Sequence, residues 1–161
     1  MPRARDFLPW NVVVVYNDMH AVLRAAQLIE QFGRKYGRRL HQKIRPAPVS
    51  YLGDAGYFER LLFEAQTADL IVVSFSGTGE LPGMLKRWIE QCAAQKQGGH
   101  ATVVALLGSS DQAEPMNSAR YQFMREAARN GGLDFFAPAV VGEDEEEVYD
   151  EPVLRQWEGV G

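Results

Sequence analysis

Residues 74–80 have the composition of a ligand-binding loop. Hydroxyl groups alternate with glycines beside one aromatic ring in the order Ser74, Phe75, Ser76, Gly77, Thr78 and Gly79. Glycines let a ligand approach the backbone closely, and hydroxyls can bind its polar edge. Phe75 offers a surface on which a planar ring could stack. The loop is therefore a candidate for binding the edge of a flat, polar ligand.

A second segment with polar side chains, residues 16–21, is poorly suited to an anion. It contains no glycine, and its single hydroxyl is the Tyr16 phenol. Asp18 would repel a phosphate group at short range, and His20 would offset this repulsion only when protonated. Asp18 and His20 could also form an acid–base pair. An aspartate that caps a helix, beside an exposed histidine, is the interpretation that the position of Asp18 before a helical pattern favours.

The rest of the sequence shows no evident set of catalytic residues. The three histidines stand at positions 20, 41 and 100, and none completes a Ser-His-Asp set or a metal-ligand spacing. Cys92 is the single cysteine, so an internal disulfide is excluded. It falls on an apolar helical stripe, which predicts a core residue. We therefore predict no catalytic residue and no metal site, and whether the chain is an enzyme stays open.

Strand and helix patterns alternate along the chain. Apolar, β-branched runs predict strands at 12–16, 40–47, 70–75, 101–107 and 133–141. Helical periodicity fills the intervals, including a helix capped by Asp54 and a stripe formed by Leu85, Trp88, Ile89 and Cys92. Alternation of this kind predicts a parallel sheet with helices on both faces.

The expected architecture is a three-layer α/β/α, doubly wound, five-stranded parallel sheet with strand order 2-1-3-4-5. Pro46 in the second strand and Pro138 in the fifth suit the two edges of such a sheet. The 161 residues fit one domain, 1–161, with an acidic C-terminal segment at 142–161. The run at 143–151 is interpreted as a solvated loop, and the last ten residues could form a short helix on the body.

In such a sheet, ligands bind beyond the carboxyl ends of the strands where the strand order reverses. That point lies between the first and third strands. Three loops therefore converge on the expected site, at 17–20, 74–80 and 108–114. The last of these contributes Ser109 and Ser110, which could contact the edge of a ring.

The segment SFSGTGELPGMLKRWIE resembles the loop and helix after the third strand in flavodoxins and flavodoxin-like reductases. The family's helix begins with a similar pattern, matched here by Leu81, Pro82, Gly83, Leu85 and Lys86. The resemblance implies a loop that packs against the ring of FMN. The implied cofactor-binding residues are Asn17, Phe75, Ser76, Gly77, Thr78, Gly79, Ser109 and Ser110.

The phosphate-binding half of that family's site is missing from its expected place. Flavodoxins carry a T-x-T-G-x-T loop after the first strand, whose N–H groups and hydroxyls bind the phosphate at a helix N-terminus. Tyr16-Asn-Asp-Met-His-Ala21 stands there instead. A phosphoacceptor receiver domain shares the topology, but its aspartate after the third strand and lysine after the fifth are absent. A receiver-like interaction module that needs no phosphate stays open.

Charge is distributed unevenly along the chain. Residues 1–50 carry nine Lys/Arg against three Asp/Glu, and residues 51–161 carry eight against eighteen, giving the net charge of −4. The molecule could be polar from one sheet edge to the other, favouring a charged protein partner or a homo-oligomer. Two ordinary solvated faces are the simpler interpretation.

Other classes of partner are disfavoured. The basic half lacks the interleaved aromatic residues of a nucleic-acid-binding surface. No apolar run is long enough to cross a membrane, and the N-terminus lacks the apolar stretch of a secretion signal, so we expect a cytoplasmic protein.

Two functions remain. The favoured one is a flavodoxin-like domain without a cofactor that acts through protein–protein contacts, because its first loop is unfit for phosphate. The alternative is an FMN-binding redox protein, of the flavodoxin or flavin reductase type, with an atypical phosphate site.

Overall fold

The computed structural model describes residues 10–35, 42–96, 100–108, 114–115, 117–141 and 144–149. Its strands are β1 (Trp10–Tyr16), β2 (Gln42–Pro48), β3 (Leu70–Phe75), β4 (Thr102–Leu107), β5 (Asp134–Val141) and β6 (Asp144–Tyr149). Its helices are α1 (Met19–Lys35), α2 (Ala55–Ala65), α3 (Gly83–Gln95) and α4 (Ala119–Asn130), with a short 3-10 helix, η2, at Val49–Gly53.

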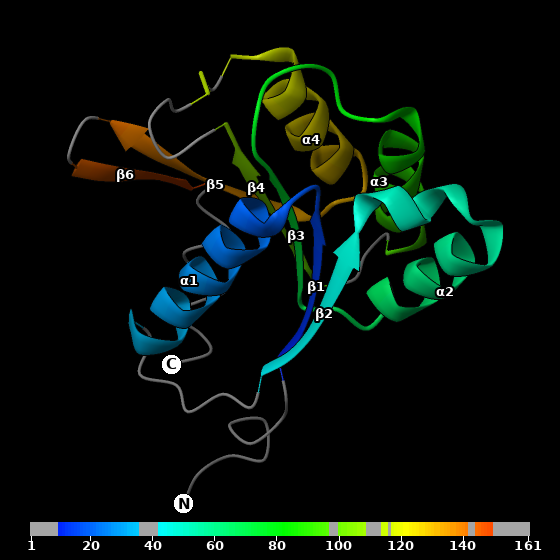
Figure 1. Ribbon diagram of the computed structural model, residues 1–161. Coiled ribbons are helices and arrows are strands. Elements are labelled where there is room, and N and C mark those ends of the chain that lie inside the picture. The colour runs from blue at the N-terminus through cyan, green and yellow to red at the C-terminus, as the bar shows by residue number, and fades with distance from the viewer. Residues whose placement is uncertain are drawn as a thin grey trace, which may run out of the picture.

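The strands of the described residues form one sheet in the order β2-β1-β3-β4-β5-β6. The first five are parallel in the predicted order 2-1-3-4-5, so the doubly wound α/β fold is confirmed. A sixth strand, β6, pairs with β5 in the antiparallel sense, which the sequence did not predict. Two expectations are thereby corrected. β5 is not an edge strand, and the acidic run is in part a strand (Figure 1).

Pro138 marks the place where β5 changes neighbours. The register of β5 against β4 ends at Phe136, two residues before the proline. From Phe136 onward β5 pairs with β6, where Pro138 stands opposite Glu147. Because proline has no N–H, it cannot donate to a ladder, and it is tolerated where pairing on one side has ended. The proline therefore signalled the end of one ladder rather than the edge of the sheet.

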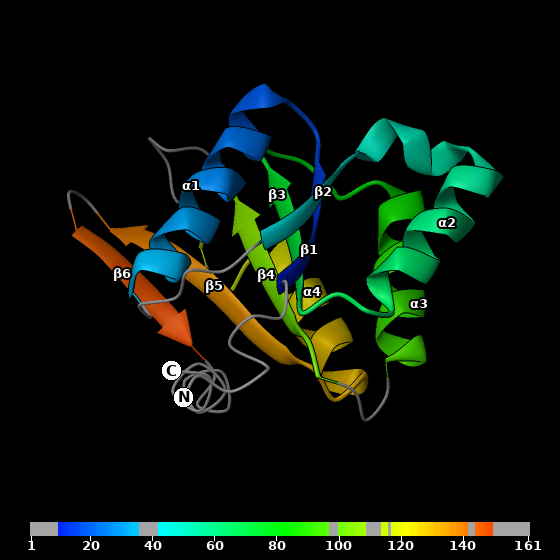
Figure 2. The same cartoon turned by 90° about the horizontal axis from the view of Figure 1, so that it is seen from below.

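Two apolar layers hold the fold together. Alternate strand residues point to opposite faces, so Val13, Ile71 and Val103 join the core under α2, α3 and α4, while Val12, Leu70 and Val104 pack under α1. In Figure 2, α1 lies on one side of the sheet and the other three helices lie on the other. The part of the chain that the structure describes thus has one helix on the first face, packed over β1, β3 and β4.

The helices begin and pack as their sequence indicates. Asp54 caps α2 by accepting from Tyr57 N–H at 2.9 Å, as predicted. Ser118 caps α4 by accepting from Tyr121 N–H at 3.2 Å. Trp88 and Cys92 are buried in the larger core, where burial raises the pKa of the Cys92 thiol. Within the described residues, no helix has the length and apolarity needed to cross a bilayer.

We expect the packing of α4 on α3 to require a glycine at the position of Gly131. A Cβ atom there would lie 2.6 Å from the Ala93 carbonyl oxygen, whereas one at Gly83 meets no atom within 4 Å. We expect Gly131→Ala to lower the free energy of unfolding by about 1–3 kcal/mol through overpacking, measured by urea denaturation. Gly83→Ala, the matched control, should not destabilise. Equal stability of the two variants would contradict this packing.

Candidate functional site

The loops after β1 and β3 lie side by side at the carboxyl end of the sheet (Figure 1). Tyr16 and Ser74 are register partners at the ends of these strands. The segments that follow, Asn17–Asp18 and Ser76–Glu80, therefore start from neighbouring positions. The sequence predicted this meeting point from the reversal of strand order.

Asn17 binds the backbone of the β3 loop at two atoms. Its Nδ2 donates to the Ser76 carbonyl at 2.9 Å, and its Oδ1 accepts from the Ser76 N–H at 3.1 Å. The side-chain amide thus continues the pairing of β1 with β3 by one residue. Asn17 is exposed, and its side-chain amide keeps a second N–H and a second lone pair for the predicted contact with a ligand.

Asp18 occupies the position where a phosphate would be expected. Its Oδ1 accepts from the backbone N–H of Ala21 in the first turn of α1, at 2.9 Å. Its Oδ2 accepts from the hydroxyl of Ser76. The hydrogen bond from Ser76, followed by the one from Ala21, holds the pKa of the Asp18 carboxyl below its ordinary value. A helix N-terminal N–H and a loop hydroxyl are the donors that phosphate groups use, and here a carboxylate of the chain takes both.

Ser74 and Phe75, which the sequence predicted in the loop, belong to the end of β3 and are turned inward. The hydroxyl of Ser74 is fully buried and donates to the Ala21 carbonyl at 2.7 Å. The ring of Phe75 is 5% exposed and belongs to the core under α2, α3 and α4. Phe75 is therefore not placed to stack on a ligand ring, because β3 is buried up to its last residue, which is Phe75.

The tip of the β3 loop is open. Gly77, Thr78 and Gly79 are exposed, and the two glycines have φ values of +87° and +110°. Residues with a Cβ rarely adopt such values, which accounts for glycine at both positions. No atom lies within 4 Å of a Cβ built at either glycine, so a ligand could approach the backbone there.

A buried ion pair supports this tip from the side of α4. Arg120 is 8% exposed and donates to the Gly77 carbonyl at 2.9 Å. Its guanidinium also binds both carboxylate oxygens of Glu114, which accepts in addition from Ser118 at 2.7 Å. Burial alone would raise the pKa of Glu114, but the bonds from Arg120 and Ser118 lower it overall. The pair therefore fixes the loop backbone and is not free for a ligand.

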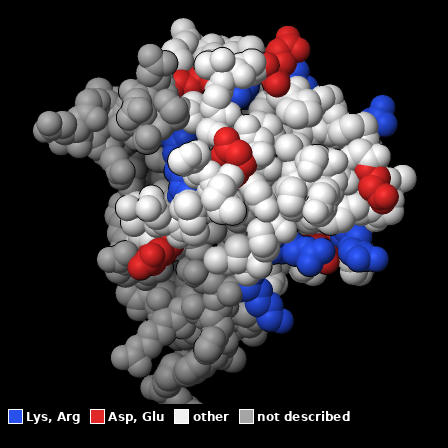
Figure 3. Space-filling view, in the orientation of Figure 1, with Lys and Arg blue, Asp and Glu red and all other residues white. Residues whose placement is uncertain are grey.

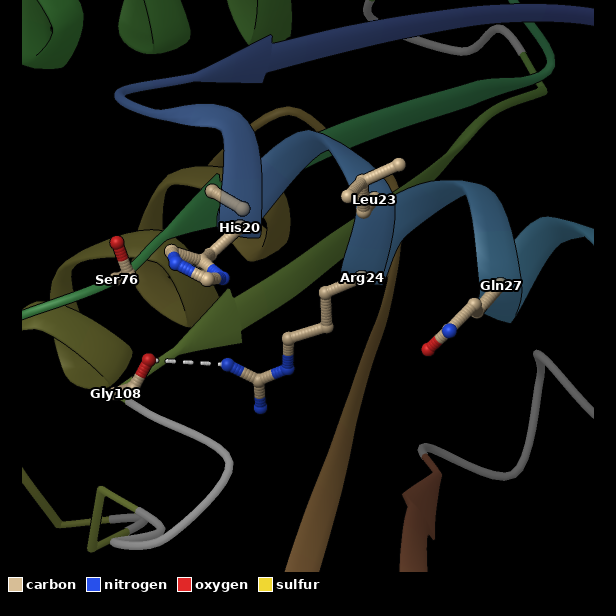
Figure 4. Close-up of a pocket in the computed structure, with 7 residues that line it drawn as sticks. His20, Leu23, Arg24, Gln27, Ser76 and Gly108 are labelled. Atoms are coloured by element: carbon tan, nitrogen blue, oxygen red, sulfur yellow. Dashed lines mark hydrogen bonds between the residues drawn. The ribbon is translucent and has the colours of Figure 1, made fainter.

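A pocket lies beside α1 and below the loops (Figure 4). Its volume is about 450 Å³. Its lining comes from α1 and from the ends of β3 and β4, through His20, Ala21, Leu23, Arg24, Gln27, Ser76 and Gly108. Arg24 reaches across it and donates to the Gly108 carbonyl at 3.1 Å. It is the pocket that adjoins the predicted site.

The predicted site residues lie in different environments in the structure. Asn17, Ser76 and Gly77 meet as expected, although their polar groups bind one another or Arg120. Thr78 and Gly79 are exposed at the loop tip, and Ser109 and Ser110 lie outside the described residues.

Sequence reasoning missed Arg24 and Arg120. Arg24 follows His20 by one helical turn, a spacing that could have drawn attention to it. No local signal connects Arg120 with a loop more than 40 positions away. Among the described residues, no cluster of three or more His, Cys, Asp or Glu could hold a metal ion.

Comparison with known proteins bears on the fold. No family model matches the chain, and no curated protein matches its sequence. An NADH:FMN oxidoreductase solved in its apo form aligns over 94% of this chain and 86% of its own, with 15% identity and a TM-score of 0.50. The fold is flavodoxin-like. A flavodoxin-like domain from Synechococcus sp. also aligns, over 92% of each chain, with 15% identity and a TM-score of 0.48.

The link between Asp18 and Ser76 should be visible in the titration of Asp18. A lowered pKa in the folded state means that the link stabilises the fold above the unfolded pKa, 3.8, and is lost as pH falls through the folded value. We expect Ser76→Ala to move the Asp18 pKa upward, because it removes the largest cause of the shift. Carbon-13 NMR of the carboxyl measures it. Thr78→Ala is the control and should leave this pKa unchanged, and an unmoved pKa in Ser76→Ala would refute the link.

Proposed function

We propose that this chain is a flavodoxin-like domain that works without a flavin and acts through protein–protein contacts. One observation carries the cofactor-free part of the proposal. The Asp18 carboxylate accepts hydrogen bonds from Ala21 N–H and Ser76 Oγ–H, at the helix N-terminus where an FMN phosphate would need to bind.

Phosphate binding at this place would meet two costs. The incoming dianion would have to displace Asp18 from both donors, and the displaced carboxylate would remain close to it as a like charge. The lowered pKa of Asp18 means that the carboxylate stays ionised at neutral pH, so protonation does not relieve this repulsion. The Asp18 carboxylate would therefore compete with a phosphate ligand for these two hydrogen-bond donors.

A flavin-binding redox protein is the second candidate, favoured by the open loop tip. Gly77 and Gly79 have empty space beside their backbone, and Thr78 is exposed between them. A ring could lie against these residues while its phosphate binds elsewhere. The aligned oxidoreductase is described as an NADH:FMN enzyme, which supports testing this candidate directly.

The two edges of the sheet support a protein partner. β2 carries Lys43 and Arg45 at one edge, where Arg45 is ion-paired with Glu64 at 3.1 Å, and β6, with the sequence Asp-Glu-Glu-Glu-Val-Tyr, forms the other. Opposite charges on opposite edges favour head-to-tail contact between copies of the chain. On the face seen in Figure 3, the described basic and acidic side chains are scattered, so this polarity depends on the two edge strands.

Contact at the β2 edge would use side chains rather than added backbone pairing. Pro46 and Pro48 have no N–H to donate, and prolines on an edge strand block the addition of another strand. Lys43 and Ile44 are exposed on the same strand. The edge therefore offers a positive charge and some apolar surface to an acidic partner.

Titration with FMN, followed by flavin fluorescence, tests the cofactor-free proposal. We expect no saturable quenching by the unaltered chain at high micromolar FMN. Asp18→Ser removes the competing carboxylate and keeps a hydroxyl, so it should bind FMN more tightly than the unaltered chain. Glu90→Ser, at an exposed position on α3, is the control. A yellow purified protein, or saturation at one FMN per chain, would establish the second candidate instead.

Sedimentation velocity at different salt concentrations tests the contact between edges. Because screening shortens the range of surface charges from about 10 Å at 0.1 M salt to about 3 Å at 1 M, self-association should weaken as salt is raised. Lys43→Glu should weaken it at low salt, whereas Arg87→Glu, on exposed α3 surface, should do so less. A single species at every concentration in low salt would eliminate a second copy as the partner.

A further inference from the structure

We propose that the pocket beside α1 binds a small organic anion, and that Arg24 binds its carboxylate. This proposal is separate from the protein contacts proposed above and concerns a different part of the fold from the sheet edges. It rests on the geometry of one flank of α1, on the donors that Arg24 keeps available, and on the size and lining of the pocket.

The first turns of α1 present a polar flank to the pocket. His20, Arg24 and Gln27 follow one another at intervals of four and three residues, so they lie on one side of the helix. Ala21 and Ala25 are buried against the sheet. Figure 4 shows the three polar side chains on the side of α1 that faces the end of β4.

Arg24 is held in place but keeps donors for a ligand. One terminal nitrogen donates to the Gly108 carbonyl at 3.1 Å, which fixes the guanidinium across the pocket. A guanidinium has five N–H donors, and within the described residues this one bond to Gly108 leaves most of them available. Among the residues that the structure describes, no ion pair involves Arg24. The nearest acids along the chain are Asp18 and Glu30, each six residues away, and Asp18 is engaged by Ser76 and Ala21.

The pocket suits a carboxylate carried on an apolar body. A volume of about 450 Å³ lies in the range of small-molecule sites, about 300–1,000 Å³. The fork of Arg24 matches a carboxylate in a two-point contact. Leu23, which is 56% exposed, and Ala21 supply apolar wall beside it. Gln27 and His20 can donate further hydrogen bonds at the rim.

The pocket shares Ala21 and Ser76 with the expected place of a flavin phosphate, but Arg24, the proposed anion contact, lies outside that place. That place is the N-terminal N–H of α1, which Asp18 occupies, whereas Arg24 lies one turn farther along the helix on its flank. The proposal that no flavin binds and the proposal that the pocket binds an anion can therefore fail independently. FMN can fail to bind while a carboxylate occupies the pocket, and a pocket that binds no anion leaves the FMN titration unaffected.

Binding of benzoate, followed by amide chemical shifts in two-dimensional NMR, tests the proposal. We expect saturable shifts centred on Ala21, Arg24 and Gly108. Arg24→Gln should weaken benzoate binding about tenfold or more, the loss expected when a charge-assisted contact is removed. Arg87→Gln, which removes an exposed arginine on α3, is the matched control and should bind as the unaltered chain does.

Three further measurements keep the test decisive. Gln27→Glu adds a negative charge at an exposed rim position and should also weaken benzoate binding, which covers the case that Arg24→Gln does not fold. Benzyl alcohol, which lacks the charge, should not saturate the same shifts. Inorganic phosphate should compete with benzoate only weakly, because it lacks the apolar body. Equal binding of the alcohol, tighter binding of phosphate, or unchanged affinity in both variants would overturn the proposal.

Discussion

The hydrogen bonds of Asp18 connect two features on which the candidate site depends. Its carboxylate joins the first turn of α1 to the loop after β3, through Ala21 N–H and Ser76 Oγ–H. Asn17 adds two bonds to the backbone of Ser76 from the adjoining position. Because these bonds satisfy donors that an anionic ligand would need, the carboxyl end of β1 and β3 is closed by the chain itself.

The candidate site therefore has two parts, the tip of the β3 loop and the pocket beside α1. The tip of the β3 loop stays open because Gly77 and Gly79 expose their backbone, while Arg120 and Glu114 fix its base from α4. The pocket on the other side takes its polarity from α1, through Arg24. In a fold that hosts many functions, the loop side chains at this end of the sheet decide which chemistry a site there could support.

The order of the strands underlies the proposal of a charged partner. The second strand from the N-terminus and the last described strand form opposite edges, so Lys43 of β2 and the acidic sequence of β6 lie at opposite edges of the sheet. Prolines protect the β2 edge from strand addition. The arrangement favours association by charge, which salt screens, rather than by continuous pairing of the backbone.

The sequence by itself determined the parallel sheet, its order and the meeting of the loops, because strand period, helix period and the handedness of crossovers are local or general constraints. It indicated the cap at Asp54 and the core position of Cys92. It could not predict that β6 pairs with β5, since its run of acids has no strand pattern and its partner decides its conformation. Nor could it show that Asp18 binds Ser76 or that Arg24 spans a pocket, because contacts between residues distant in the chain exist only once the sheet has brought them together.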